Sequence, residues 1–275
     1  MSEQTGGRAR RPRLAPGALA VASVLASVLL VVLQRAPRAR AAVVTEERPG
    51  GLPNGALDPR RVETFLAAVR GTGAVACELA VRSVSGRNWN GRGGDPSAGA
   101  DTAARTLVDD VLMRNAAAAA VPELRTALGD ADACVRRVAA PILGRVDDPA
   151  ATRALLDALR DPTAPTRAAG ATGLAYSGRR RAGDVRDPLA AALRDADAAV
   201  RAASAWALGE LHVTGVTSAI AELLHDRDTG VRRASAVALG SLEDPAAVAP
   251  LVSALRDDAD PGVRQAAAWA LGQLK

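Results

Sequence analysis

Aromatic residues are scarce in this chain. They make up 2% of its 275 residues, as three tryptophans, one tyrosine and one phenylalanine, so a large core built on aromatic rings is not expected. Hydrophobic residues still reach 48% of the chain, and many of them are alanine. Because alanine buries little surface and is the best helix former, the composition predicts closely packed helices.

Cysteine is also rare, and Cys77 and Cys134 are the only two in the chain. They can pair if the protein is exported. In different structural repeats, however, their Cα atoms are expected to lie too far apart for a disulfide. The sequence therefore predicts two small, half-buried thiols and leaves open whether they have a redox role.

The net charge of +5 is concentrated at the N-terminal end. Residues 1–41 hold 7 of the 35 basic residues and 1 of the 30 acidic residues, which leaves 28 basic and 29 acidic residues in the remainder. A near-neutral body lacks the electrostatic footprint of a nucleic-acid-binding protein. No nucleic-acid partner is therefore expected.

A long uncharged stretch follows the first arginines. Residues 14–33 carry no charge over twenty positions, which is long enough for a membrane-spanning helix. Ala39 and Ala41 offer a small-residue cleavage pattern, although the neighbouring arginines disfavour cleavage. Residues 1–41 are thus predicted to be a membrane anchor or a signal peptide cleaved after Ala41, with a buried helix as the third possibility. Both main alternatives place the body outside the cytoplasm, membrane-anchored, periplasmic or secreted.

One fifteen-residue motif recurs through the second half of the chain, as in DADAAVRAASAWALG (195–209) and DADPGVRQAAAWALG (258–272). The copies align on a shared arginine, at Arg136, Arg167, Arg201, Arg232 and Arg264, with spacings of 31, 34, 31 and 32. An aspartate stands six residues before each arginine, and a glycine stands eight residues after four of them. The aspartates suit helix starts, and the glycines suit helix ends or close helix packing.

Each motif predicts a helix that follows a second amphipathic segment, such as TSAIAELL (217–224). The pair forms a helical hairpin that cannot bury its apolar face alone, so the copies must stack. The predicted fold is all-α, an α-solenoid of stacked helical hairpins preceded by the hydrophobic helix. The expected layout is a linker at 42–59, a degenerate N-terminal capping repeat with a Gly-rich loop at 60–100, and the repeat array at 101–275, which begins with a helix over 102–120.

The motif resembles the HEAT-like repeats, in particular the short type named after phycobilisome chromophore lyases, over about residues 119–275. The segment LRDADAAVRAASAWALGEL (193–211) and its relatives at 224–242 and 255–274 carry the resemblance. In that family, the aspartate and arginine of the motif form a structural ladder between neighbouring repeats. The resemblance implies that role for Asp130, Arg136, Asp161, Arg167, Asp195, Arg201, Asp226, Arg232, Asp258 and Arg264.

The resemblance also implies an alternative, enzymatic function, because two kinds of enzyme, bilin chromophore lyases and deoxyhypusine hydroxylase, contain such repeats. The hydroxylase family holds iron with His-Glu dipeptides, and this chain has none; its two histidines, His212 and His225, have no metal-ligand spacing. There is no Gly-rich phosphate loop and no nucleophile elbow. We therefore expect no metal, no cofactor and no catalytic residues, with an enzyme of either kind as the alternative.

Three features are candidates for binding a partner. Trp206 and Trp269 each stand five residues after a repeat arginine, on the flank of a helix that usually lines the concave side of such a stack. Tryptophan is a frequent hot-spot residue, although packing between repeats is the plainer interpretation. Arg179, Arg180 and Arg181 can meet an acidic partner or a lipid head group, or simply lie in a solvated loop over 177–187. The third is the smooth, alanine-rich faces of the motif helices.

The sequence thus favours a scaffold that binds another, unidentified protein on its concave face, exported or tethered to a membrane through residues 14–33. The C-terminal hairpin is expected to leave a flank uncovered that includes parts of Val263, Leu271 and Leu274. Two outcomes are open for that flank: it is exposed to solvent, or it mediates weak end-to-end self-association with a second copy of the protein.

Overall fold

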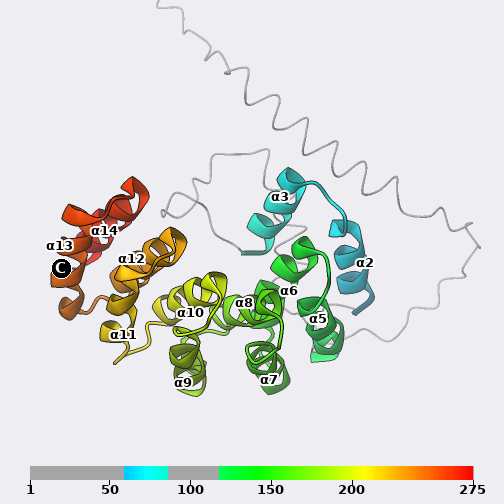
Figure 1. Ribbon diagram of the computed structural model, residues 1–275. Helices are drawn as coiled ribbons and strands as arrows, with labels where there is room; N and C mark the ends of the chain where they lie inside the picture. Colours follow the sequence, from blue (N-terminus) through cyan, green and yellow to red (C-terminus); the bar gives the residue numbers. More distant parts are fainter. Residues whose placement is uncertain (1–58, 86–117, 275) are drawn as a thin grey trace, which may run out of the picture. The chain divides into compact units, whose positions relative to one another are not determined.

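The computed structural model describes residues 59–85 and 118–274, and within these ranges every regular element is a helix. Consecutive helices form hairpins (Figure 1). The hairpins are α2 (Pro59–Val69) with α3 (Ala74–Ser85), α5 (Val121–Leu128) with α6 (Ala133–Arg145), α7 (Pro149–Ala158) with α8 (Ala164–Leu174), α9 (Ala182–Ala192) with α10 (Ala198–Glu210), α11 (Thr217–Glu222) with α12 (Thr229–Leu242), and α13 (Val248–Asp257) with α14 (Pro261–Gln273). Short 3-10 turns add Ala118–Ala120, Arg179–Arg181, Leu223–His225 and Pro245–Ala247.

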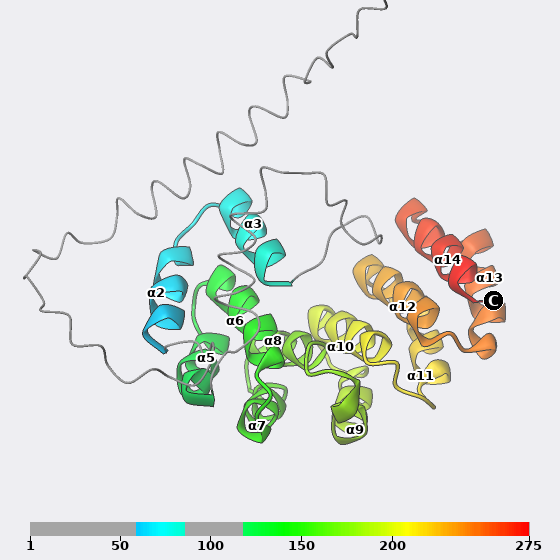
Figure 2. The same ribbon diagram turned by 180° about the vertical axis from the view of Figure 1, so that it is seen from behind.

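The hairpins stack in chain order. Each second helix packs on the first helix of its own hairpin, and α6, α8, α10, α12 and α14 pack on one another in sequence. Figures 1 and 2 show these second helices along the inner side of the stack, with α5, α7, α9, α11 and α13 along the outer side. The described residues therefore form an α-solenoid, as the repeat pattern predicts.

Aspartates start most of the repeat helices in the way the motif predicts. Asp132, Asp197, Asp228 and Asp260 are the N-caps of α6, α10, α12 and α14, and their carboxylates accept hydrogen bonds from backbone N–H groups of the first turn. These bonds satisfy donors that have no partner inside the helix. Thr163 occupies this position before α8 and makes no side-chain cap, in keeping with the weakest copy of the motif.

The motif glycines allow neighbouring inner helices to approach closely. A Cβ atom placed on Gly209 would lie 2.7 Å from the Cα atom of Ala238, and one on Gly240 would lie 2.7 Å from the Cα atom of Ala270. Of the two roles that the sequence left open for these glycines, close packing is the one that the contacts demand. The residue opposite each of these glycines is an alanine, Ala238 or Ala270, so both helices present small residues where they cross.

Gly209→Ala is expected to lower the free energy of unfolding by about 2 kcal/mol, because the new methyl group must push α10 and α12 apart. Gly272 is the matched control, since it holds the same motif position and a Cβ atom there meets nothing within 4 Å. Gly272→Ala should be neutral or slightly stabilising, because alanine favours a helix. Urea unfolding of both variants measures the difference, and equal effects would contradict the crossing contact.

The prediction of unpaired cysteines is wrong. Cys77 on α3 and Cys134 on α6 form a disulfide, with a Cα–Cα distance of 5.6 Å. The error came from treating separate repeats as distant, whereas α3 packs directly on the start of α6. Cys77 stands where later repeats carry the ladder arginine, so at this junction a covalent bond joins the two hairpins.

The expected loop over 177–187 is also shorter than predicted. Residues 179–181 form a 3-10 turn, and α9 begins at Ala182. The extra residues of this repeat lie mainly in the connection from α8 to α9, which includes this 3-10 turn, and α9 contains Pro188. The predicted exposure of Val263 is wrong too, because this side chain is fully buried, while Leu271 and Leu274 are half-buried.

The predicted location outside the cytoplasm on a membrane anchor is corrected as well. Among residues 59–85 and 118–274, no helix is long and apolar enough to cross a bilayer. The stretch 14–33, which carried that prediction together with the cleavage pattern at Ala39 and Ala41, lies outside the described residues. So do residues 42–58 of the predicted linker, the Gly-rich loop and residues 102–117 of the predicted helix, whereas Pro59 begins α2.

Candidate partner-binding face of the inner helices

Three rows of side chains define the solvent side of the inner helices, here called the inner face. They stand one, five and nine residues after each motif arginine, a spacing that places them on one side of a helix, and of these side chains only Pro141 on α6 is buried. On α12 the rows are Arg233, Val237 and Ser241, all at least partly exposed, whereas Val231, Ser235 and Leu239 are buried. The inner face is therefore the side left free after each helix has packed on its hairpin partner and its two neighbours.

The middle row carries the two predicted tryptophans. Trp206 on α10 and Trp269 on α14 flank Val237 on α12, and all three hold the same position in their repeats. Trp269 is 46% exposed and is one of three large hydrophobic side chains that the described residues leave exposed. Its ring leans toward Gly240 of α12. The structure thus brings both tryptophans to one face.

Trp206 belongs to a chain of contacts along this face. Its indole N–H donates to Glu210 at 3.1 Å, and its ring meets Tyr176 edge to face at a centroid distance of 5.6 Å. The guanidinium of Arg145 lies 4.5 Å from the centre of the Tyr176 ring, a cation–π distance. These contacts fix the aromatic rings in place, and rigid rings suit recognition because little side-chain entropy is lost on binding.

The three predicted arginines lie beside this face but differ in their contacts. Arg181 donates to the hydroxyl of Thr152 at 2.8 Å and to the carboxylate of Asp147 at 3.0 Å, so it joins the turn to the preceding hairpin. Arg179 is exposed, and the side chain of Arg180 lies outside the described residues. Arg181 therefore has a structural role, and of the two described arginines only Arg179 faces solvent.

The motif arginines and aspartates form ion pairs between consecutive hairpins. Arg167 binds Asp195, Arg201 binds Asp226, and Arg232 binds Asp258, each through two N–H···O contacts of 2.7–3.1 Å. Each of these arginines also donates to backbone carbonyls of its own hairpin turn. One guanidinium thereby ties three segments together.

The pairing is absent at both ends of this series. Within the described residues, Arg136 donates only to the carbonyls of Asp130 and Ala131, and Asp161 accepts from the hydroxyl of Thr163 in place of a guanidinium. At the first junction, Arg70 takes over the contact with Asp130. Arg264 contacts the carbonyls of Asp258 and Ala259, with no carboxylate partner among the described residues. The pairs are therefore structural links within the stack.

These links should make the protein sensitive to acid. The hydrogen bonds from Arg167, Arg201 and Arg232 lower the pKa values of Asp195, Asp226 and Asp258. A lowered pKa means that the stabilisation is present at neutral pH and is lost as the pH falls below about 4, through the folded-state pKa values. Chemical unfolding at falling pH should show a decrease in the free energy of unfolding. The decrease should be smaller in Arg201→Ala, which lacks one of the three ion pairs. An equal decrease in the variant would contradict the assignment of the acid sensitivity to these pairs.

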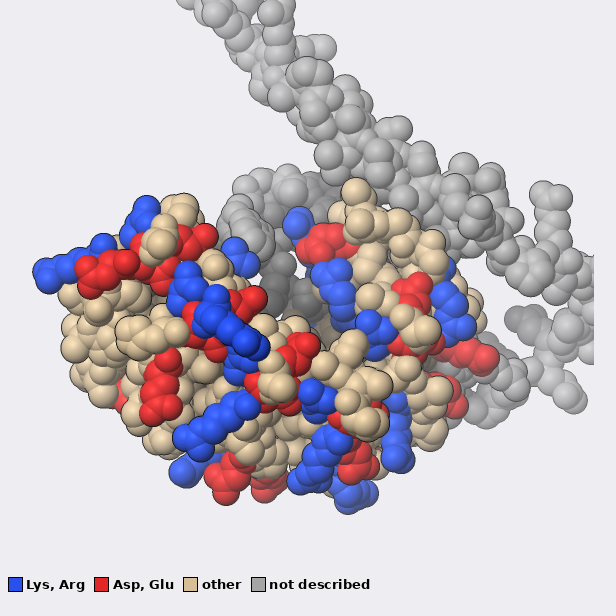
Figure 3. Space-filling view, viewed as in Figure 1, with Lys and Arg blue, Asp and Glu red and all other residues tan. Residues whose placement is uncertain are grey.

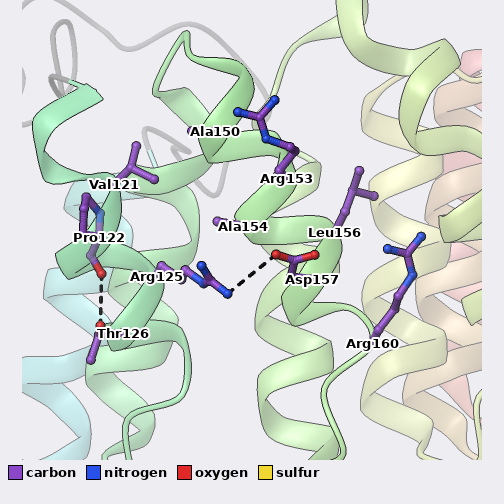
Figure 4. Close-up of a pocket in the computed structure, with 10 residues that line it drawn as sticks. All are labelled: Val121, Pro122, Arg125, Thr126, Ala150, Arg153, Ala154, Leu156, Asp157 and Arg160. Carbon is purple, nitrogen blue, oxygen red and sulfur yellow. Dashed lines mark hydrogen bonds and ion pairs between the residues drawn. The ribbon is translucent and has the colours of Figure 1, made fainter.

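A separate cleft of about 820 Å³ lies on the outer side, between α5 and α7 (Figure 4). Arg125 and Asp157 face each other across it, with a nitrogen–oxygen distance of 3.7 Å, while Arg153 and Arg160 border it from the α7 side. Figure 3 shows basic side chains gathered over α7 at the lower edge of that view. Sequence reasoning missed this cleft, because its arginines belong to helices that were considered only for their apolar faces.

The described residues contain no group of three or more His, Cys, Asp or Glu side chains arranged to hold a metal ion. His212 adopts a left-handed backbone conformation after α10, and His225 is exposed. Nothing in the described part of the chain brings the two histidines together with carboxylates into a site.

The stacked hairpins, the arginine–aspartate links and the exposed inner face define an α-solenoid repeat protein. A family model described as HEAT repeats matches residues 95–175 and 186–272, which is more than half of the chain. The chain therefore belongs to the HEAT repeat family. No curated protein matches it.

Several solved structures are similar in fold. The complex of CpcE and CpcF of phycocyanin lyase from Nostoc sp. PCC7120 is 22% identical, with a TM-score of 0.44, and the match covers 84% of this chain and 81% of that chain. A designed armadillo repeat protein in complex with the peptide (KR)4 is 17% identical, with a TM-score of 0.43 and coverages of 79% and 99%. Human deoxyhypusine hydroxylase is 19% identical, with a TM-score of 0.37 and coverages of 94% and 98%.

Proposed function

We propose that this protein is a non-catalytic scaffold whose inner face binds another protein. The observation that carries the proposal is the row of Trp206, Val237 and Trp269, in which one large indole is 46% exposed on a rigid helix. An exposed tryptophan held on a rigid helix is the kind of anchor that dominates protein interfaces. The solenoid supplies a long surface of repeated geometry on which a helix or an extended peptide can lie.

The charges of the inner face also support a polypeptide partner. Arg233 is exposed and has no ion-pair partner among the described residues, whereas Arg137 pairs with Glu78 at 2.8 Å. A mixed face of this kind, with apolar anchors and few unpaired charges, resembles the apolar centre and polar rim of protein interfaces. We therefore expect a partner with an apolar segment flanked by acidic residues.

Site-specific photo-cross-linking tests which side is used. A photoreactive side chain at Gln265, exposed on the inner face of α14, should yield a cross-linked partner in the native cell extract. The same group at Ala249, exposed on α13 of the outer side, is the matched control and should yield none. A cross-link from position 249 without one from position 265 would contradict the proposal.

The weak end-to-end association of the C-terminal hairpin stays a separate proposal. Leu271 and Leu274 are half-buried and Trp269 is exposed on α14, so some apolar surface remains there. Sedimentation at rising concentration tests it, with Leu271→Glu/Leu274→Glu as the variant that should stay monomeric.

A further inference from the structure

We propose that the cleft between α5 and α7 is a second binding site, and that its ligand is an acidic segment of a polypeptide. The site lies on the outer side of the stack, so it is distinct from the inner face and does not depend on the function proposed for that face. Its walls come from two neighbouring first helices, and its volume of about 820 Å³ accommodates several residues of an extended chain.

The charge of the cleft is unbalanced. Three guanidinium groups border it, from Arg125, Arg153 and Arg160, against the single carboxylate of Asp157. Arg153 and Arg160 make no ion pair with any described residue, and both side chains are exposed. Like charges gathered around one cleft repel each other, and an anionic ligand would remove that repulsion.

The ion pair inside the cleft, between Arg125 and Asp157, leaves the N–H donors of Arg125 free for a ligand. Arg125 and Asp157 are 3.7 Å apart, which is beyond hydrogen-bond distance, and their side chains are 64% and 58% exposed. A ligand carboxylate can therefore hydrogen-bond to Arg125 without first breaking a strong contact. Exposed pairs of this kind contribute little stability, so the exchange costs little.

The rest of the lining favours a polypeptide over a nucleic acid. Among the described residues, no aromatic side chain borders the cleft, so this lining offers no platform for base stacking. Val121, Ala154 and Leu156 instead give it an apolar floor suited to aliphatic side chains. The outer helices thus present cations at the rim and aliphatic contacts below.

The spacing of the arginines suggests the register of the ligand. Arg153 lies on α7, and Arg160 lies two residues after the end of α7, beyond a C-cap that is still in a helical conformation. At the helical rise, the seven positions between them correspond to about 10 Å. A peptide in the polyproline II conformation covers about that distance in one turn of three residues. A glutamate at every third position therefore places successive carboxylates on one side of the peptide, at about the spacing of the two arginines.

Fluorescence anisotropy with a labelled peptide of repeated Glu-Gly-Gly units tests the proposal on the full chain. We expect saturable binding that weakens with salt, and no binding of the matched Lys-Gly-Gly peptide. In Arg153→Glu/Arg160→Glu, two attractive contacts become repulsive, so the dissociation constant should rise about tenfold or more. Trp269→Ala should leave this binding unchanged, which separates the cleft from the inner face.

Arg194→Glu is the position-matched control, and it reverses one charge where the double variant reverses two. Arg194 follows α9 at the repeat position that Arg160 holds after α7, and it does not line the cleft. This variant should bind the acidic peptide like the original protein, and circular dichroism checks that all variants stay folded. Equal weakening by Arg194→Glu, unchanged binding in the double variant, or tighter binding of a single-stranded oligonucleotide than of the acidic peptide would each overturn the proposal.

Discussion

Reduction of the Cys77–Cys134 disulfide is expected to lower the free energy of unfolding by about 4 kcal/mol, the entropy estimate for a closed loop of this length. The two cysteines are 57 residues apart in sequence and buried between α3 and α6. The bond stands at the junction that lacks an arginine–aspartate pair of the later kind, so its loss should release the first hairpin before the rest. Urea unfolding with and without a reductant measures the change.

The double variant Cys77→Ser/Cys134→Ser is the control. Its free energy of unfolding should equal that of the reduced protein and should not change when the reductant is added. Hydrogen exchange of α2 and α3 should rise in both reduced forms, while α10 and α12 stay protected. Identical unfolding curves for the oxidised and reduced protein would show that the disulfide does not stabilise this junction.

Arg201→Ala is expected to cost about 3 kcal/mol of stability, because it leaves a buried carboxylate without its partner. Arg201 and Asp226 are each only 9% exposed, and the arginine also holds the carbonyls of Asp195 and Ala196. The variant removes one link in the middle of the stack, so both neighbouring hairpins lose support. Thermal and chemical unfolding report the loss.

Arg264→Ala is the matched comparison for that variant. Arg264 makes the same backbone contacts within its own turn but has no carboxylate partner among the described residues. The difference between the two variants therefore isolates the contribution of the pair between hairpins. If Arg264→Ala costs as much as Arg201→Ala, the stabilisation comes from the turn contacts and not from the link to the next repeat.

The periodicity of the motif was sufficient to predict the hairpins, because helix caps and apolar spacing are local properties. Asp197 and Asp228 cap the helices that follow them, and Gly209 marks a tight helix crossing. The family resemblance supplied the pairing of Arg201 with Asp226. It did not indicate that Asp161 would accept a hydrogen bond from the hydroxyl of Thr163, which replaces the usual aspartate, and not from the arginine of the preceding hairpin.

The remaining features depend on distances between residues far apart in sequence. The Cys77–Cys134 bond follows from how α3 packs on α6, which no spacing rule specifies. The cleft between α5 and α7 is lined by residues of two different hairpins, small ones such as Ala150 among them. Arg181 was grouped with Arg179, although only the three-dimensional turn directs it toward Thr152.

Binding of a protein partner to the inner face can be measured directly by titrating the cross-linked partner against two single variants. Trp269→Ala should weaken binding at least about tenfold, as expected of a central aromatic anchor. Val248→Ala removes a hydrophobic side chain of similar exposure, 41%, from α13 on the outer side and should leave the affinity unchanged. Unchanged affinity in Trp269→Ala, or a comparable loss in Val248→Ala, would contradict the assignment of the inner face.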